Sequence, residues 1–541
     1  MAVVGIKSFG GIAPKVPPRY LQDNQAQVAL NCPVFAGSIQ PLSDVSAALT
    51  TLPKTGMIQT IYRYGQDTVS DTQYWFHWTS DVDVCRSQIA GDTQEWTFFT
   101  GDGGPKATHS GIALTGNNYP ANSRPMGLAA PAAAASAVVS GAVDETETVE
   151  TRVYTYTFVN KEAGREIESA PAPASASVDV RTSQSVTLNN LSTTPGAGYI
   201  ATHKRIYRST SGVFLFVAEI AASATTFSDT VDPDDLAEEL PSLYWSPPPA
   251  ALEGIINMPN GMMAGFVGRD LYFCEPYRPH AWPENYIQTI DYPVVGLGRM
   301  DTTLAVLTTG TPYLVQGAHP DSVAVVKSDL EQACVSKRSI VSFGGGVIYA
   351  APDGLMMLSP GGSRIVTQGL FSYKQWQSYF KPESIHAYQH DNKYIAFYYN
   401  SDTGVSGGFI FDMTSGQFIL HDIYATGGYH DLQRDKLFLV MPNRTVVAWE
   451  YGGAMDYVWR SKKFTMPQIM GFSCAQLEAE AYPVVAKFYA DGNLIHSQTV
   501  QNRNPFRLPA KVGRDWEIQV EGSSEVFSVA IANSMSELAN A

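Results

Sequence analysis

Two histidines, His386 and His390, lie four residues apart. On a helix, this spacing would direct both imidazoles at one metal ion. The surrounding sequence, IHAYQHDNKYIAFYY, instead alternates like a strand that turns at Asp391 and Asn392. No nearby carboxylate is placed to act as a general base. We therefore expect both histidines to be structural, and we predict no metal site.

Four aspartates, Asp229, Asp232, Asp234 and Asp235, form a second cluster that could do chemistry. Carboxylate oxygens are the ligands that calcium prefers. The cluster lacks the glycine-spaced loop of specific calcium motifs, and it lies at the expected exit from a predicted β-sandwich. We expect a solvated acidic linker.

The glycine cluster GDGGPK, residues 101–106, lacks the hydroxyl residue and the preceding apolar strand of a phosphate-binding loop, so it predicts an ordinary turn. The chain has no GxSxG elbow, no HExxH, no GxxxxGK loop ending in Ser or Thr, and no GxGxxG after a strand. It also lacks the SxDxGxTW boxes of sialidase-like propellers, and linear spacing cannot establish a carboxylate pair for glycoside hydrolysis. We predict that the protein is not an enzyme and has no catalytic residues and no cofactor.

Aromatic residues offer one binding hypothesis. A sugar-binding platform could be formed by His280, Trp282 and Pro283. It could also be formed by the tryptophans Trp75, Trp78 and Trp96. Tryptophans at strand ends more often pack one sheet against the next. We expect packing.

The cysteines are odd in number, scattered and without a CxxC pair: Cys32, Cys85, Cys274, Cys334 and Cys474. This pattern argues against a disulfide framework and against a zinc site. It favours free, mostly buried thiols in a reducing compartment.

The composition favours β-structure. Charged residues make up 16% of the 541 residues, whereas 28 Tyr, 24 Phe, 45 Gly and 33 Pro are typical of short strands joined by tight turns. The formal net charge is −15, which opposes tight binding to DNA phosphates but would let DNA slide past without sticking. The N-terminus lacks the apolar core of a signal peptide, and no apolar run is long enough to span a membrane. We expect synthesis and folding in the cytoplasm.

Five regions follow along the chain. Residues 1–55 are an extended segment with many Pro and Gly, and residues 56–126 hold aromatic strands at 58–64 and 74–78. Residues 127–141 look like a linker without strand pattern. Short strands then run to residue 245, as in one β-sandwich. This region carries 15 acidic and 7 basic residues, so we expect it to face solvent. Its order of strands, from YTYTFVN through KRIYRSTSGVFLFVAEI to TTFSDT, resembles a fibronectin type III-like module.

A pattern of strand, turn and strand recurs after the SPPPAALEG stretch, within residues 246–456. Its members begin near Asp270, Leu304, Gly346, Lys393 and Lys436, about 34, 42, 47 and 43 residues apart. Strand pairs at such spacing are typical of propeller blades. Residues 457–541, with a hairpin turn at Asp491 and Gly492, predict a second, smaller sandwich. The predicted fold class is all-β: a β-propeller interrupted by an inserted fibronectin- or Ig-like sandwich and followed by a C-terminal β-rich sandwich. The number of blades is left open.

Several runs resemble the propeller-bearing tail proteins of short-tailed phages, called nozzle, tail tubular or virion structural proteins. The likeness lies in LQDNQAQVALNCPVFAGSIQPL (21–42), MPNGMMAGFVGRDLYFCEPYRPHAWPENY (258–286), YPVVGLG (292–298), TTGTPYLVQG (308–317), CVSKRSIVSFGGGVIYAAPDGL (334–355) and the C-terminal FYADGNLI and RDWEIQVEG runs. None of these runs is a catalytic motif.

The resemblance implies a homo-oligomeric, usually hexameric ring in the virion. Such a ring extends the channel for double-stranded DNA below the portal and adaptor proteins, and helps to retain and then release the genome. Tail fibres are further expected partners, and no membrane span is expected. The sequence does not identify channel-lining residues. The main alternative is a receptor- or glycan-binding tail-tip adhesin without catalysis; a propeller hydrolase is the least favoured reading.

Overall fold

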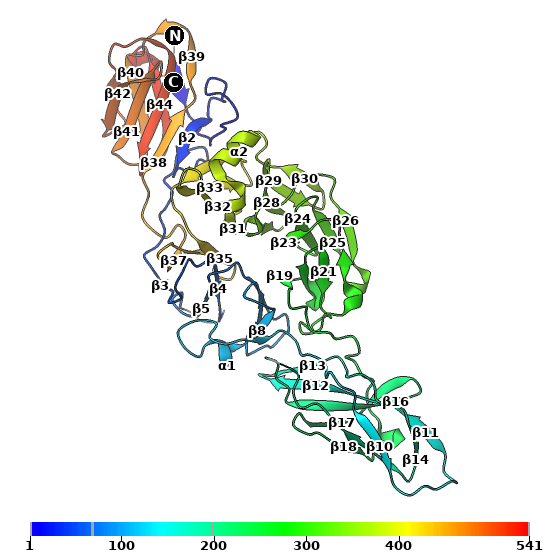
Figure 1. Ribbon diagram of the computed structural model, residues 1–541. Helices are drawn as coiled ribbons and strands as arrows, with labels where there is room; N and C mark the ends of the chain where they lie inside the picture. The colour runs from blue at the N-terminus through cyan, green and yellow to red at the C-terminus, as the bar shows by residue number, and fades with distance from the viewer. Residues whose placement is uncertain (1–2, 66–69, 197, 539–541) are drawn as a thin grey trace. The chain divides into compact units, whose positions relative to one another are not determined.

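The computed structural model describes residues 3–65, 70–196 and 198–538 (Figure 1). Strands dominate, so the predicted all-β class is confirmed. Helices in the described residues are short: α1 (Ser110–Ala113), α2 (Tyr373–Phe380), α3 (Met535–Leu538) and the 3-10 turns η1 (Pro233–Asp235), η2 (Pro259–Gly261), η3 (Glu284–Tyr286), η4 (Pro320–Ser322), η5 (Lys337–Ser339) and η6 (Pro382–Ser384). The chain divides into two compact units, residues 1–79, 305–314 and 327–541, and residues 80–304 and 315–326.

The middle part of the second unit's sequence forms a β-sandwich. One sheet has the order β13-β12-β16-β17, and the others have the orders β10-β15-β18 and β11-β14. The bounds are β10 (Ser136–Ser140), β11 (Val149–Arg152), β12 (Tyr154–Glu162), β13 (Arg165–Glu168), β14 (Val178–Arg181), β15 (Ser185–Asn189), β16 (His203–Thr210), β17 (Val213–Ala221) and β18 (Phe227–Asp229). Tyr154, Tyr156 and Ile206 of the four-stranded sheet share a core with Val186 and Leu188 of the three-stranded sheet. Two sheets closing on one apolar core define a sandwich.

The linker prediction is wrong for its last residues, because Ser136–Ser140 forms β10 and pairs with β15. Ala137 and Val139 pack against the sandwich core, while the residues that alternate with them along the strand face solvent. Small side chains make this alternation weak in the sequence, so strand pairing decides the structure here.

Two four-stranded antiparallel sheets complete the core of the second unit. Their orders are β6-β7-β8-β9 and β19-β20-β21-β22. They share a cluster that includes Trp96, Phe98, Leu252, Ile255 and Trp282. The bounds are β6 (Asp83–Arg86), β7 (Thr97–Thr100), β8 (Lys106–Thr108), β9 (Arg124–Pro125), β19 (Glu253–Asn257), β20 (Met263–Val267), β21 (Asp270–Phe273) and β22 (Gln288–Thr289). A further four-stranded sheet, which contributes residues to both units, consists of β23 (Val294–Met300), β24 (Thr303–Thr308), β25 (Tyr313–Gln316) and β26 (Ala324–Lys327).

The first unit contains two more four-stranded sheets and one hairpin. The first sheet consists of β27 (Val341–Phe343), β28 (Gly346–Ala351), β29 (Gly354–Ser359) and β30 (Gly362–Ile365). The second has the order β3-β37-β36-β35, with β3 (Thr50–Thr51), β35 (Gly427–Asp431), β36 (Lys436–Val440) and β37 (Thr445–Ala448). The hairpin consists of β4 (Thr60–Arg63) and β5 (Trp75–Trp78). Four-stranded antiparallel sheets in series are the units from which propellers are built. Their radial closure into one disc stays a prediction.

A long sheet of this unit has the order β31-β32-β33-β34-β2-β38-β44-β41-β42, with β39 paired to β44. A second sheet, β1-β45-β40-β43, shares its core through Leu477, Val529 and Ile531, packed with Phe488 and Trp516. The bounds are β1 (Val3–Ile6), β2 (Ala26–Leu30), β31 (His386–His390), β32 (Lys393–Asn400), β33 (Val405–Asp412), β34 (Phe418–His421), β38 (Tyr457–Ser461), β39 (Phe464–Met470), β40 (Cys474–Ala479), β41 (Val484–Ala490), β42 (Asn493–Val500), β43 (Phe506–Arg507), β44 (Gly513–Gly522) and β45 (Val526–Ala532).

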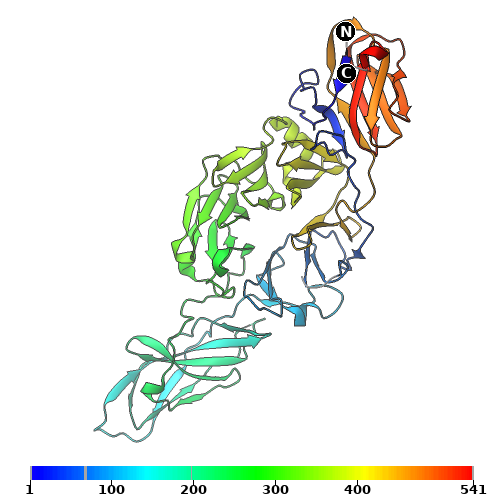
Figure 2. The same ribbon diagram turned by 180° about the vertical axis from the view of Figure 1, so that it is seen from behind.

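The N-terminal segment is built into sheets formed by the far end of the sequence. Strand β1 pairs with β45, β2 lies between β34 and β38, and β3 pairs with β37. Figure 2 shows the blue N-terminal strands beside the orange and red C-terminal strands. The chain ends therefore stabilise each other within the first unit.

Two-residue turns set the register of the hairpins. Asp391 and Asn392 both have positive φ, 46° and 54°, and His390 pairs with Lys393 across them. Two positive φ values match the right-handed twist of the flanking strands. Asp491 and Gly492 join β41 to β42 in the same way. Both predicted turns are confirmed.

Candidate functional site

The two histidines with helical spacing do not converge. Both lie on strand β31, where four residues span roughly 13 Å. His386 is buried against Phe397 and Tyr424, with ring centroids 5.4 and 6.4 Å away. Burial lowers its pKa well below the usual value, so the ring is neutral. The predicted structural role of His386 agrees with this packing.

His390 instead faces residues from a different sheet. Its Nδ1 lies 3.9 Å from Oδ1 of Asp435, and Nε2 of His430 lies 4.0 Å from the same oxygen. The three donor atoms lie within 4.8 Å of one another. Neither imidazole nitrogen has a hydrogen-bond partner. Among the residues that the structure describes, this is the cluster of His, Cys, Asp or Glu with the geometry to hold a metal ion.

Local structure places these three side chains. The turn at Asp391 holds His390 at the end of β31, and His430 lies on β35, one residue before a loop. Asp431 closes that loop by accepting hydrogen bonds from the backbone nitrogens of Gln433 and Arg434. The sequence prediction missed His430 and Asp435, because they lie 40 and 45 residues after His390 and no motif joins them.

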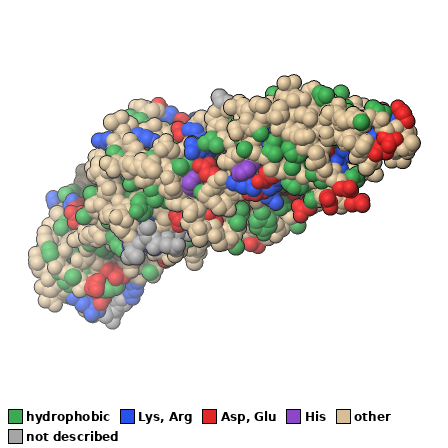
Figure 3. Space-filling model, turned by 90° about the horizontal axis from the view of Figure 1, so that it is seen from below, with side chains coloured by type: hydrophobic (Ala, Val, Ile, Leu, Met, Phe, Trp, Pro, Cys, Tyr) green, Lys and Arg blue, Asp and Glu red, His purple; other side chains and the backbone are tan. Residues whose placement is uncertain are grey.

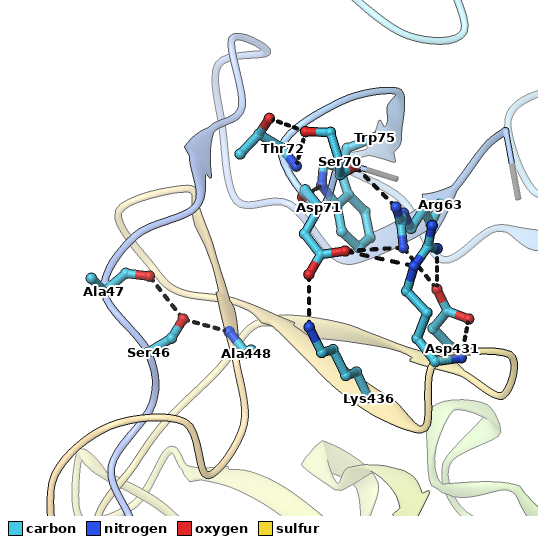
Figure 4. A network of polar contacts seen from close by, with 11 residues as sticks. Ser46, Ala47, Arg63, Ser70, Asp71, Thr72, Trp75, Asp431, Lys436 and Ala448 are labelled. Atoms are coloured by element: carbon cyan, nitrogen blue, oxygen red, sulfur yellow. Dashed lines mark hydrogen bonds and ion pairs between the residues drawn. The ribbon is translucent and has the colours of Figure 1, made fainter. Parts of the chain in front are cut away.

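A buried ion network lies next to this cluster on hairpin β35–β36 (Figure 4). The guanidinium of Arg63, only 1% exposed, contacts Asp431 at 3.0 Å and Asp71 at 3.2 Å. Asp71 also contacts Lys436 at 2.9 Å, and Asp431 contacts Arg434 at 3.1 Å. The network ties hairpin β4–β5 to a hairpin more than 360 residues later in the sequence.

The expectation of a solvated acidic linker is wrong for Asp229. Its carboxylate is fully buried and lies 2.8 Å from Arg208, with the Tyr154 hydroxyl donating to it at 2.7 Å. A buried charge must be paired, and the sandwich supplies Arg208 from β16. The other three aspartates are exposed, and Asp232 caps turn η1 by accepting from the Asp234 nitrogen.

The residues of the proposed sugar platform are packed inside the protein. Trp75, Trp78, Trp96, Trp282 and His280 are each at most 5% exposed, so the packing prediction is confirmed. The GDGGPK segment joins β7 to β8, and Lys106 contacts Asp102 at 2.9 Å. The amine that a phosphate site would use is therefore paired within the turn.

A small cavity of about 30 Å³ lies beside Trp96. The guanidinium of Arg165, the first residue of β13, lies 5.1 Å from the ring centroids of both Trp96 and Phe98. Burial lowers the pKa of Arg165 to about 10. The cavity has room for roughly one water molecule. The contact of Arg165 with the Trp96 and Phe98 rings therefore serves packing.

All five cysteines are free and buried, as predicted. Burial raises the pKa of Cys85, Cys274 and Cys334 to about 12. Since the thiolate is the reactive form, these thiols are unreactive near neutral pH.

The charged surface is broken into groups. On the face seen in Figure 3, acidic side chains lie in separate clusters, several of them beside basic ones. Arg205, for example, contacts Glu219 at 3.0 Å. Within the described residues, no helix is both long and apolar enough to cross a membrane.

Comparison with solved structures gives distant likenesses. No protein-family model and no curated protein matches the chain. A crystal structure of BBS1N in complex with ARL6DN matches at a TM-score of 0.24 and 7% identity, over 49% of this chain and 86% of that one.

Two bacterial structures also match. The extracellular domain of a hybrid two-component system from B. thetaiotaomicron matches at a TM-score of 0.28 and 10% identity, over 86% of this chain and 47% of that one. PorZ, a surface component of the type-IX secretion system of Porphyromonas gingivalis, matches at a TM-score of 0.25 and 11% identity, over 71% of this chain and 46% of that one. This chain thus spans less than half the length of either protein. Likenesses this weak carry no argument about function.

Proposed function

We propose that this chain is a non-enzymatic structural subunit of the tail of a double-stranded DNA bacteriophage. It forms a homo-oligomeric ring, a nozzle, that extends the DNA channel below the portal and adaptor proteins and helps to retain and then release the genome. It acts in the virion after assembly in the host cytoplasm.

One observation carries the proposal. The runs that resemble nozzle proteins coincide with three successive four-stranded sheets, β19–β22, β23–β26 and β27–β30. The runs are residues 258–286, 292–298, 308–317 and 334–355. Propeller blades have short, protected edges, so such a body packs sideways into a ring without open-ended strand pairing. A closed ring then needs heterologous contacts between copies.

The first test is the oligomeric state of the untagged full chain. Mass photometry and negative-stain electron microscopy are expected to show closed rings, six copies being the expected number. Antibody-gold labelling of phage particles that encode the chain is expected at the tail. A monomer at all concentrations that also fails to label virions would contradict the proposal.

The second candidate is a receptor- or glycan-binding adhesin at the tail tip. It is favoured by a groove of about 530 Å³ in the second unit, lined by Trp245, Phe216, Arg205 and several glutamates. Tyr244, next to Trp245, is 68% exposed. Amphipathic rings beside charged groups suit sugar recognition. Binding on a glycan array that is lost in Trp245→Ala would support this candidate, and an array without signal would exclude glycans as its ligands.

A further inference from the structure

We infer that His390, His430 and Asp435 form a binding site for a late first-row divalent cation of the Zn²⁺ type, which bridges two sheet edges. The inference concerns the first unit alone and does not depend on ring formation.

The donor set determines the class of ion. Imidazole nitrogens suit Zn²⁺ and its neighbours in the first transition row, whereas Mg²⁺ and Ca²⁺ prefer oxygen ligands throughout. Two imidazoles and one carboxylate supply three protein ligands, which leaves a fourth position of a tetrahedral site for water.

The three side chains need to move only a short distance to bind an ion. Zn–N bonds of 2.0–2.1 Å place tetrahedral ligands about 3.3 Å apart. Asp435 now lies 3.9 and 4.0 Å from the two imidazole nitrogens. Its side chain is 88% exposed and belongs to the last residue of the turn between β35 and β36, so it can move inward. The imidazoles are only 13% and 16% exposed, so they are already held in place.

The two imidazole nitrogens also need a partner. Nδ1 of His390 and Nε2 of His430 are inaccessible to solvent and make no hydrogen bond. Buried polar atoms are normally satisfied.

Neighbouring cations do not occupy the site. Arg434 and Lys436 flank Asp435 in the sequence, but both reach into the network around Asp71 and Asp431. Lys393, opposite His390 in the register, contacts Asp391. The carboxylate of Asp435 therefore remains directed at the histidines.

The backbone brings the two strands close enough for a shared ion. Strand β31 is the last strand of the long sheet, and β35 is the last strand of its own sheet, so both are edges. A Cβ added at Gly428 on β35 would lie 2.9 Å from the Tyr388 ring of β31. This close approach lies two residues from each histidine. A bound ion would cross-link edges that no strand pairing joins.

The test is titration of the untagged full chain with Zn²⁺ by calorimetry, with Co²⁺ absorption as a spectroscopic readout. We expect one saturable site, visible Co²⁺ bands of imidazole ligation, and no effect of Mg²⁺. His390→Gln, His430→Gln and Asp435→Asn should each weaken binding at least tenfold. The matched control is His319→Gln, which removes a histidine that also lies near a carboxylate, Asp321 at 3.5 Å, but without a second imidazole.

A structural readout separates metal loss from misfolding. Zn²⁺ should slow hydrogen exchange of residues 427–440 in the parent chain and in His319→Gln, but not in a folded His430→Gln chain. The inference is overturned if the parent chain shows no saturable site, or if His430→Gln binds Zn²⁺ as tightly as the parent.

Discussion

Arg63 carries a charge into a region that solvent barely reaches. Its guanidinium is held by Asp71 and Asp431, and Trp75 closes the group by donating its indole N–H to the Asp71 carbonyl at 2.9 Å. Removing one partner of a buried ion pair leaves an uncompensated charge, which costs more than the pair itself contributes. The network is therefore sensitive to single substitutions.

Arg63→Met is expected to lower the free energy of unfolding of the first unit by about 3 kcal/mol, because Asp71 and Asp431 lose their shared cation. Differential scanning calorimetry would measure the shift. The control is Arg503→Met, which breaks a pair with Glu478 in which Arg503 is 68% exposed, and should cost less than about 1 kcal/mol. Equal effects of the two substitutions would contradict the argument.

Buried histidines make the stability depend on pH. His421 packs against Phe397 and Trp449, and burial lowers its pKa to about 3. In the unfolded chain its pKa is roughly 6.5. Below that pH the unfolded state takes up a proton that the native state does not, so acidification destabilises the fold.

His421→Phe is expected to reduce this loss of stability by roughly 1.4 kcal/mol per pH unit between pH 6 and pH 4. Denaturant unfolding at a series of pH values would measure the slope. From pH 7 to pH 8 the two chains should differ only by a constant amount. An unchanged slope below pH 6 would show that His421 does not contribute.

At the scale of single elements, the N-terminal strand β1 is expected to matter for the C-terminal sandwich. Ile6 is 3% exposed and pairs with Val529. Ile6→Ala should destabilise that sandwich by about 2–5 kcal/mol, through lost burial and the cavity left behind. Val3→Ala, at a position 37% exposed on the same strand, should change stability by less than about 0.5 kcal/mol.

Hydrogen exchange of residues 474–532 would locate the effect of Ile6→Ala. Faster exchange confined to strands β40 and β45 is the expected pattern. If exchange is faster only in residues 1–30, the N-terminal segment would be an addition to a sandwich that is stable without it.

Elements also explain why the histidine cluster could not be predicted. The alternation around IHAYQHDNKYIAFYY correctly indicated a strand and its turn, and this placed His390 at the end of β31. Nothing in the local sequence shows which strand lies opposite an edge. His430 meets His390 only because β31 and β35 are packed side by side, which is a property of the assembled sheets.

For the whole molecule, the net charge of −15 predicts indifference to DNA. Electrophoretic mobility of a double-stranded DNA fragment should stay unchanged at all salt concentrations from about 25 to 200 mM, because phosphate binding requires a basic surface. A retarded band at low salt that disappears as salt rises would reveal such a surface. It would also weaken the proposal that DNA passes without binding.

The sequence by itself determined the structural class and much local detail. Its aromatic runs, turn residues and scarce charges predicted an all-β protein, and Asp391-Asn392 and Asp491-Gly492 predicted their turns, because these properties depend on neighbours along the chain. It also indicated that the tryptophans and cysteines are buried, since apolar and thiol side chains seldom stay in water.

Only the tertiary structure decided which distant residues meet. Pairing of β1 with β45, burial of Asp229 against Arg208, and the meeting of His390 with His430 join residues that are not neighbours in sequence. Such contacts arise when sheets close on shared cores, and they leave no periodic trace in the chain. For the same reason, the chemistry of the candidate site is a product of the fold rather than of a motif.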